Sequence, residues 1–137
     1  MKLIGLSFDK ISAEKIGEKL EGVKVDSNIE IIDIKKADFD ILKDKEEMLD
    51  IKFRQTIQYN PDYAKLEFKG IMLVSLDYKE AKELLKNWQK NKKVPDEFQL
   101  TFLNIIIHKS APKAMQLEED LGIPFHIPLP RIARKTD

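Results

Sequence analysis

The feature that most constrains the fold is an alternating run at positions 49–59. Apolar side chains occupy its odd positions, with Gln55 as the one polar exception, and its even positions are polar or charged. A period of two over this length predicts a β-strand with one buried and one solvated face. Residues 60–62 (Asn-Pro-Asp) then predict a turn, because proline fixes one backbone dihedral and cannot donate to a strand ladder.

A second strand is predicted directly after this turn. Ala64, Leu66 and Phe68 alternate with charged residues, Gly70 interrupts the pattern, and residues 71–74 continue as an apolar run. Two such strands joined by a short turn form a β-hairpin. The apolar run predicts that the second strand ends in a segment buried on both faces.

Further strands are predicted on the N-terminal side of the hairpin. Residues 1–8 form a short apolar run, and residues 29–34 form a β-branched one. The polar residues 26–28 (Asp-Ser-Asn) predict a turn before the second of these strands. Residues 9–22 fit two alternatives, a helix capped by Ser12 or a continuation of the first strand.

The periodicity becomes helical after the hairpin. A lysine-rich face lies opposite an apolar stripe in residues 79–90, which predicts a helix that is broken at residues 91–93, before Pro95; the stripe consists of Ala81, Leu84, Leu85 and Trp88. A second helical pattern runs from residue 96 to about His108. Pro112 either opens a further helix or kinks one long helix, and Gly122 ends it. Strands followed by helices predict an α+β fold with an antiparallel sheet.

Composition narrows the class of protein. The 137 residues suit a single domain spanning 1–137, with enough apolar side chains for one core. The 24 basic and 24 acidic side chains balance, which does not favour a nucleic-acid or membrane-surface protein. The absence of cysteine excludes disulfides and thiolate catalysis. The N-terminal apolar run is too short for a signal peptide, so we expect a cytoplasmic protein.

No motif indicates catalysis, a metal site or a cofactor. His108 and His126 are the only histidines, and we expect both at a solvent edge or an interface. The acidic triplet at residues 118–120 is typical of a solvated helix end. No serine lies in a nucleophile-elbow pattern, and the glycines form no phosphate-binding loop. We therefore expect a binding protein that is not an enzyme and uses no cofactor.

Two segments are candidates for binding. Residues 79–93 carry six lysines and two glutamates, which fits either a solvated helix face or a basic patch for nucleic acid or an acidic partner. We favour the solvated face, because no arginine or aromatic ladder accompanies the lysines. The tail after Gly122 repeats proline at three positions, with apolar residues between them that cannot form a core of their own: Phe125, Ile127, Leu129 and Ile132.

The order of these elements resembles the SecB protein-export chaperone family. The resemblance lies in the strand at 28–34 followed by a crossover loop at 37–42, and in the long hairpin with a glycine before an apolar run. Leu-Asn-Ile-Ile at 103–106 resembles the start of the family's main helix. Gly-Ile-Pro at 122–124 and the proline-bearing apolar segment after it resemble the end of that helix. Residues 78–94 look like an insertion that adds a helix.

The resemblance implies a four-stranded antiparallel sheet with helices on one face. It also implies a homo-oligomer, a dimer or a tetramer, whose main helices pack between sheets through Phe102, Ile105 and Ile106. The implied function is ATP-independent holding of unfolded polypeptide. We expect the polypeptide-binding surface in the crossover loop and the tail, at Phe39, Ile41, Leu42, Phe125, Ile127, Leu129 and Ile132; burial within the subunit is an equally good interpretation of these residues.

Two other functions remain open. The same apolar tail fits a non-enzymatic adaptor or structural subunit that binds one dedicated protein partner. The lysine-rich helix fits, less well, a protein that binds nucleic acid.

Overall fold

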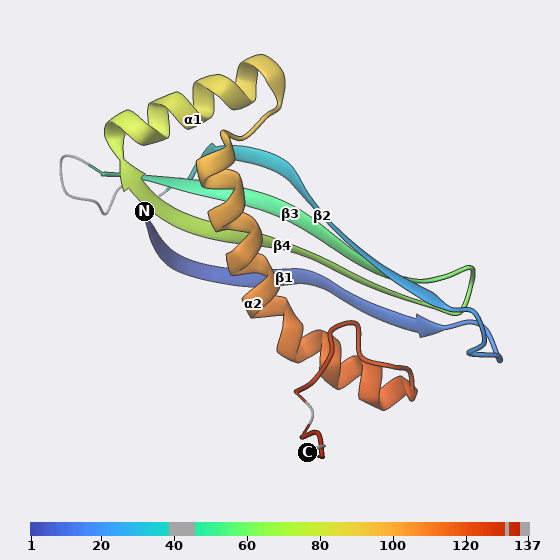
Figure 1. Ribbon diagram of the computed structural model, residues 1–137. Helices are drawn as coiled ribbons and strands as arrows, with labels where there is room; N and C mark the ends of the chain where they lie inside the picture. Colours follow the sequence, from blue (N-terminus) through green and yellow to red (C-terminus); the bar gives the residue numbers. More distant parts are fainter. Residues whose placement is uncertain (39–45, 131, 135–137) are drawn as a thin grey trace.

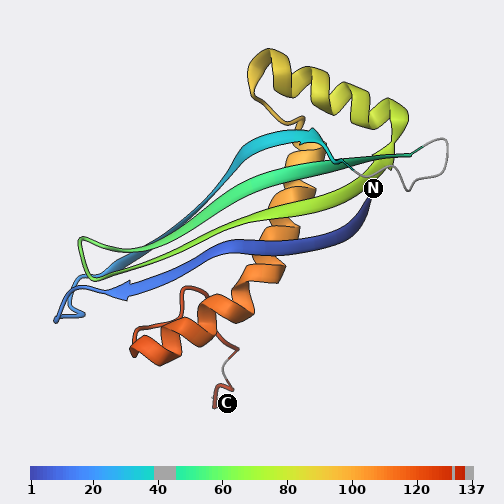
Figure 2. The ribbon, with the colours of Figure 1, turned by 180° about the vertical axis from the view of Figure 1, so that it is seen from behind.

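The computed structural model describes residues 1–38, 46–130 and 132–134. Four strands precede two helices: β1 (Lys2–Lys15), β2 (Lys24–Lys36), β3 (Glu46–Asn60), β4 (Ala64–Asp77), α1 (Tyr78–Asn91) and α2 (Asp96–Leu121). The strands form one antiparallel sheet in the order β1-β4-β3-β2. Figures 1 and 2 show α2 crossing one face of this sheet while α1 lies near one end. The predicted α+β fold with an antiparallel sheet is confirmed.

The predicted hairpin forms the centre of the sheet. Glu46 lies opposite Asp77 at one end of the β3–β4 ladder, and Tyr59 lies opposite Ala64 at the other. The alternating side chains of β3 are buried on the face toward the helices. In the apolar run of β4, Met72 and Val74 are fully buried, while Ile71 and Leu73 are half-buried. The prediction of a run buried on both faces is therefore only partly correct.

The helices close the buried face of the sheet. Along α1 the helical spacing directs Ala81, Leu84 and Trp88 toward the sheet, and along α2 it directs Phe102 and Ile106. These side chains pack with the inward residues of β3 and β4 in one apolar cluster. A second cluster lies under the C-terminal half of α2. One face of the sheet is covered and the other is solvated, which explains the strict alternation of apolar and polar residues in the sequence.

Gly70 is required by a close approach between strands. A Cβ atom at this position would meet the Ser7 carbonyl oxygen and would lie 2.8 Å from Cζ of Phe53. The strand continues through Gly70 without a break. Because glycine has no side chain, the Phe53 ring can lie against the backbone at this position. Phe8 packs edge-on against that ring, with 6.2 Å between the ring centroids.

Two predictions near the N-terminus are settled by the sheet. Residues 9–15 continue β1, so the strand alternative is confirmed there, with bulges near Ile4 and Asp9. The turn predicted at residues 26–28 is wrong, because these residues pair with 56–58 inside the β2–β3 ladder. Their polar side chains are solvent-exposed, and the Asn60 amide donates to Asp26 across the ladder at 2.6 Å. The chain turns instead at Gly22, whose φ is 75°.

The second helix is longer than its first apolar pattern indicates. It continues through Pro112 to Leu121 as one helix, which confirms the long-helix alternative. Proline lacks the N–H that would bond to the carbonyl one turn earlier, and its ring crowds that carbonyl. Figure 1 shows the helix changing direction in its second half, where it passes beyond β1.

Gln55 is an unusual residue of the buried face. Its side chain is 2% exposed, and its Oε1 atom accepts no hydrogen bond from any described residue. It lies between Ile29 and Phe68 on the neighbouring strands, where the two apolar clusters meet. A buried polar atom without a partner lowers stability by about 1–3 kcal/mol.

We predict that Gln55→Met raises the free energy of unfolding by about 1 kcal/mol, because methionine fills a similar volume without a buried acceptor. Urea denaturation measures this change. Gln58→Met, at an exposed position of the same strand, is the control and should change stability little. A loss of stability in Gln55→Met would show that the amide has a favourable role in the core.

Candidate polypeptide-binding surface

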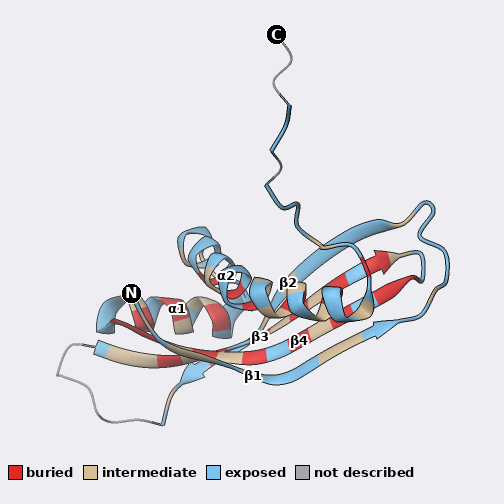
Figure 3. Cartoon of the chain, turned by 90° about the horizontal axis from the view of Figure 1, so that it is seen from below, coloured by how far each residue is buried: buried red, intermediate tan, exposed pale blue. Residues whose placement is uncertain are grey.

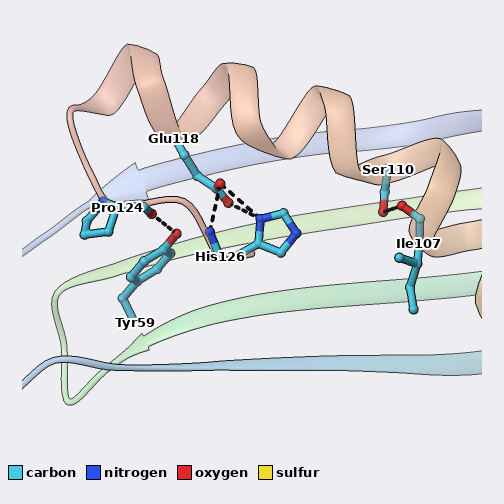
Figure 4. A network of polar contacts seen from close by, with 6 residues as sticks. All are labelled: Tyr59, Ile107, Ser110, Glu118, Pro124 and His126. Carbon is cyan, nitrogen blue, oxygen red and sulfur yellow. Dashed lines mark hydrogen bonds and ion pairs between the residues drawn. The ribbon is translucent and has the colours of Figure 1, made fainter. Parts of the chain in front are cut away.

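A buried polar network fastens the root of the C-terminal tail. Glu118 in the last turns of α2 is 0% exposed, and its Oε1 accepts the backbone N–H of His126 at 3.1 Å. Its Oε2 lies 2.7 Å from Nδ1 of the same histidine, whose side chain is only 6% exposed. Since a carboxylate only accepts, Nδ1 carries the proton. Figure 4 shows both contacts from one carboxylate.

A second contact holds the same segment against the sheet. The Tyr59 hydroxyl of β3 donates to the carbonyl oxygen of Pro124. Burial, and then the negative charge of Glu118, raise the pKa of the Tyr59 hydroxyl well above its ordinary value of 10.0. Tyr59 therefore remains a neutral donor over the whole neutral pH range.

The chain reaches this network through the helix end. Gly122 adopts a left-handed conformation with φ 65°, and its N–H bonds to the carbonyl of Glu119. The next residue, Ile123, donates to the carbonyl of Glu118 and buries its side chain. This is the Schellman arrangement, in which a glycine permits the reversal and an apolar residue follows it. It returns the chain over the sheet instead of releasing it to solvent.

The contacts of Glu118 with His126 and of Tyr59 with Pro124 are together called the anchor. Beyond the anchor the tail is exposed. Of the four predicted tail residues, Phe125 is half-buried, while the remaining three are increasingly exposed along the chain: Ile127 36%, Leu129 51% and Ile132 104%. In Figure 3 the last described residues project away from the sheet and helices. These apolar side chains thus form a surface that the subunit itself does not cover, which we call the tail surface.

The remaining predicted residues fall into two groups. Phe39, Ile41 and Leu42 of the crossover loop lie outside the described residues. On α2, Phe102 and Ile106 are fully buried in the subunit's own core, and Ile105 packs partly against it. The opposite surface of the helix is exposed, with Leu100 65% and Ile107 41% exposed.

Glu118 and His126 are the residues whose role the sequence analysis missed. The acidic triplet was expected to be solvated, yet only Glu119 and Asp120 are exposed. The sequence predicts both histidines at a solvent edge or an interface; His126 is instead paired in the interior, whereas His108 is exposed. A signal was present: Glu118 continues the four-residue spacing of the buried stripe, Phe102, Ile106, Ser110 and Ala114.

Among the described residues, no three or more histidine, aspartate or glutamate side chains gather in a way that would hold a metal ion. Within that same part of the chain, no helix is long and apolar enough to cross a membrane.

The comparisons with known proteins agree with this architecture. No protein-family model matches the sequence, and no curated protein matches it significantly. Among solved structures, the chain is similar to the SecB-like chaperone Rv1957 of Mycobacterium tuberculosis, solved in complex with a ChAD peptide from the Rv1956 HigA1 antitoxin. The TM-score is 0.55 at 16% identity, over 98% of this chain and 92% of that one. The two proteins therefore share a fold.

We predict that His126→Ala lowers the free energy of unfolding by about 3 kcal/mol, because it leaves the Glu118 carboxylate buried without its partner. The double variant Glu118→Leu/His126→Leu should lose less, since it removes the buried charge as well. Urea denaturation compares the two. Equal stability of His126→Ala and the unaltered protein would contradict the anchor.

We also predict an alkaline effect of Tyr59. Its raised pKa means that the unfolded chain ionises first, so stability falls as the pH rises above 10.0, by up to about 1.4 kcal/mol per pH unit. In Tyr59→Phe this part of the pH dependence should be absent, whereas Tyr78→Phe, at an exposed tyrosine, should keep it. Unfolding free energies measured on both sides of pH 10 decide the matter, and identical slopes for all three proteins would contradict it.

Proposed function

We propose that this protein is a SecB-like holdase that binds non-native polypeptide segments through exposed apolar side chains, without nucleotide and without catalysis. The observation that carries the proposal is the tail surface. Its root is fixed by the Glu118 and Tyr59 contacts, while Ile127, Leu129 and Ile132 remain open to solvent.

A fixed root with an open apolar end suits a binding protein that accepts many sequences. Proline residues at 128 and 130 limit the conformations of the tail, so less entropy is lost when it binds. Each apolar side chain buried against a partner contributes about 1.5–3 kcal/mol. Non-directional contacts of this kind tolerate a change in the partner's sequence.

The fold likeness supports the same proposal. The similar protein from Mycobacterium tuberculosis is a SecB-like chaperone that was solved with a bound peptide. We include in the proposal the crossover-loop residues Phe39, Ile41 and Leu42 as a further part of the binding surface. A cytoplasmic location and a role in protein transport also belong to the proposal.

We further propose that the protein acts as a homo-oligomer. The outward face of α2 carries Leu100 and Ile107, which lack a covering element within the described chain. Exposed apolar side chains on a central helix are typical of a surface that packs against another subunit. Ile105 lies on the other side of the helix, where it packs partly against the subunit's own core.

A dedicated adaptor is the second candidate function. It is favoured by one observation, that the peptide in the similar structure comes from one named antitoxin. An adaptor would use the same tail surface for a single partner. A pull-down from the native host would then return that partner in stoichiometric amount.

We predict that the triple variant Ile127→Ser/Leu129→Ser/Ile132→Ser needs at least about tenfold more protein for half-suppression of aggregation of a chemically unfolded model protein. Light scattering without nucleotide measures this suppression. The unfolding transition of the variant should be unchanged, because these side chains are exposed.

The matched control replaces three exposed apolar residues outside the tail: Ile16→Ser/Leu20→Ser/Val25→Ser. It should suppress aggregation as well as the unaltered protein. Equal loss in both triple variants would contradict the tail as the binding surface. Failure of the unaltered protein to suppress aggregation would contradict the holdase and leave the adaptor.

A further inference from the structure

A groove lies beside α1, along the side of the helix that adjoins its core-facing stripe. Its volume is about 320 Å³, and it is bounded by the end of β2, the start of β3 and three turns of the helix. The residues that matter for its chemistry are Lys36, Glu47, Tyr78, Lys82, Leu85 and Lys86.

The walls of the groove are apolar. Ala81 is buried at its base and Leu85 is half-buried, while Tyr78 leaves 57% of its surface exposed at the rim. The helical period explains this arrangement. Residues 78, 82, 85 and 89 form the stripe next to the one that packs on the sheet, so α1 covers the core with one stripe and lines the groove with the other.

The rim of the groove is basic. Lys82 and Lys86 project from α1, and neither forms an ion pair within the part of the chain that the structure describes. Lys36 stands on the opposite side, where its Nζ lies 3.6 Å from Oε1 of Glu47. The whole chain carries no net charge, so this positive charge is a local feature of the groove. An apolar groove with a lysine rim complements an acidic ligand that also carries apolar groups.

We propose that this groove docks an acidic peptide segment, whose aliphatic side chains enter between Tyr78 and Leu85 and whose carboxylates pair with Lys82 and Lys86. The proposal goes beyond the holdase function and does not depend on it. Figures 1 and 2 show α1 at the end of the molecule away from the C-terminal tail, so the groove is separate from the tail surface.

A peptide fits the groove better than a nucleic acid does. The groove offers apolar surface with one tyrosine instead of the series of aromatic stacking platforms that bind single-stranded nucleic acid. Its volume suits one or two aliphatic side chains. Nucleic-acid binding is therefore an outcome that the experiment must separate from peptide binding.

The test uses the full chain and a fluorescein-labelled peptide in which glutamates flank two adjacent leucines, followed by fluorescence anisotropy. We expect saturable binding that weakens as salt rises, because exposed charges are screened. In Lys82→Glu/Lys86→Glu the peptide should bind at least about tenfold more weakly. In Lys90→Glu/Lys93→Glu, which changes the net charge equally outside the groove, it should bind almost unchanged.

The apolar part of the groove has its own test. Tyr78→Ser in the protein, or serines in place of both leucines in the peptide, should each weaken binding. Equal loss in the two lysine variants would mean attraction by bulk charge and would overturn the proposal, as would no binding at all. A single-stranded RNA oligonucleotide that displaces the peptide at lower concentration than unlabelled peptide would also overturn it. The aggregation assay with Lys82→Glu/Lys86→Glu should match that of the unaltered protein, which separates this site from the tail surface.

Discussion

The whole structure depends on one constraint, the single buried face of the central β3–β4 hairpin. Its two long strands present a row of buried side chains that are apolar except at Gln55, from Leu49 to Tyr59 on one strand and from Ala64 to Leu76 on the other. Such a face must be removed from water, and the two outer strands cannot cover it because they lie in the same sheet. The two helices that follow the strands cover this face, which sets their position. The tail begins where α2 ends, at one side of the molecule.

The anchor of the tail is a small polar network within this apolar core. A carboxylate with no exposure is unfavourable unless hydrogen bonds satisfy it, and His126 contacts it through its ring nitrogen and its backbone N–H. Because Glu118 projects from the buried stripe of α2, the partner must come from the returning chain. The same contact therefore fixes the position at which the tail leaves the domain, and the apolar residues beyond it are exposed to solvent.

The parts of the fold that the sequence predicted are those where a local period dominates. The hairpin and α1 have clear periods of two and of 3.6, and both were predicted within a few residues. The strand ends were harder, because residues 26–28 favour a turn locally while cross-strand pairing with residues 56–58 holds them extended. Pro112 was ambiguous for a similar reason, since packing on the sheet maintains the helix across it. The tail residues were predicted from their apolar character, and their role in binding stays a prediction. The Glu118–His126 pair depends on a chain reversal at Gly122 that no periodic pattern indicates.

The central claim is that the tail itself contacts non-native polypeptide. The most direct measurement places a photo-crosslinking amino acid at Leu129 and, in a separate protein, at Ile16, and exposes each to the same client in unfolded and native form. Our account predicts crosslinks to the unfolded client from position 129, few from position 16, and few to the native client from either. Crosslinks from position 129 that reach only another copy of this chain, or that reach native and unfolded client equally, would contradict it.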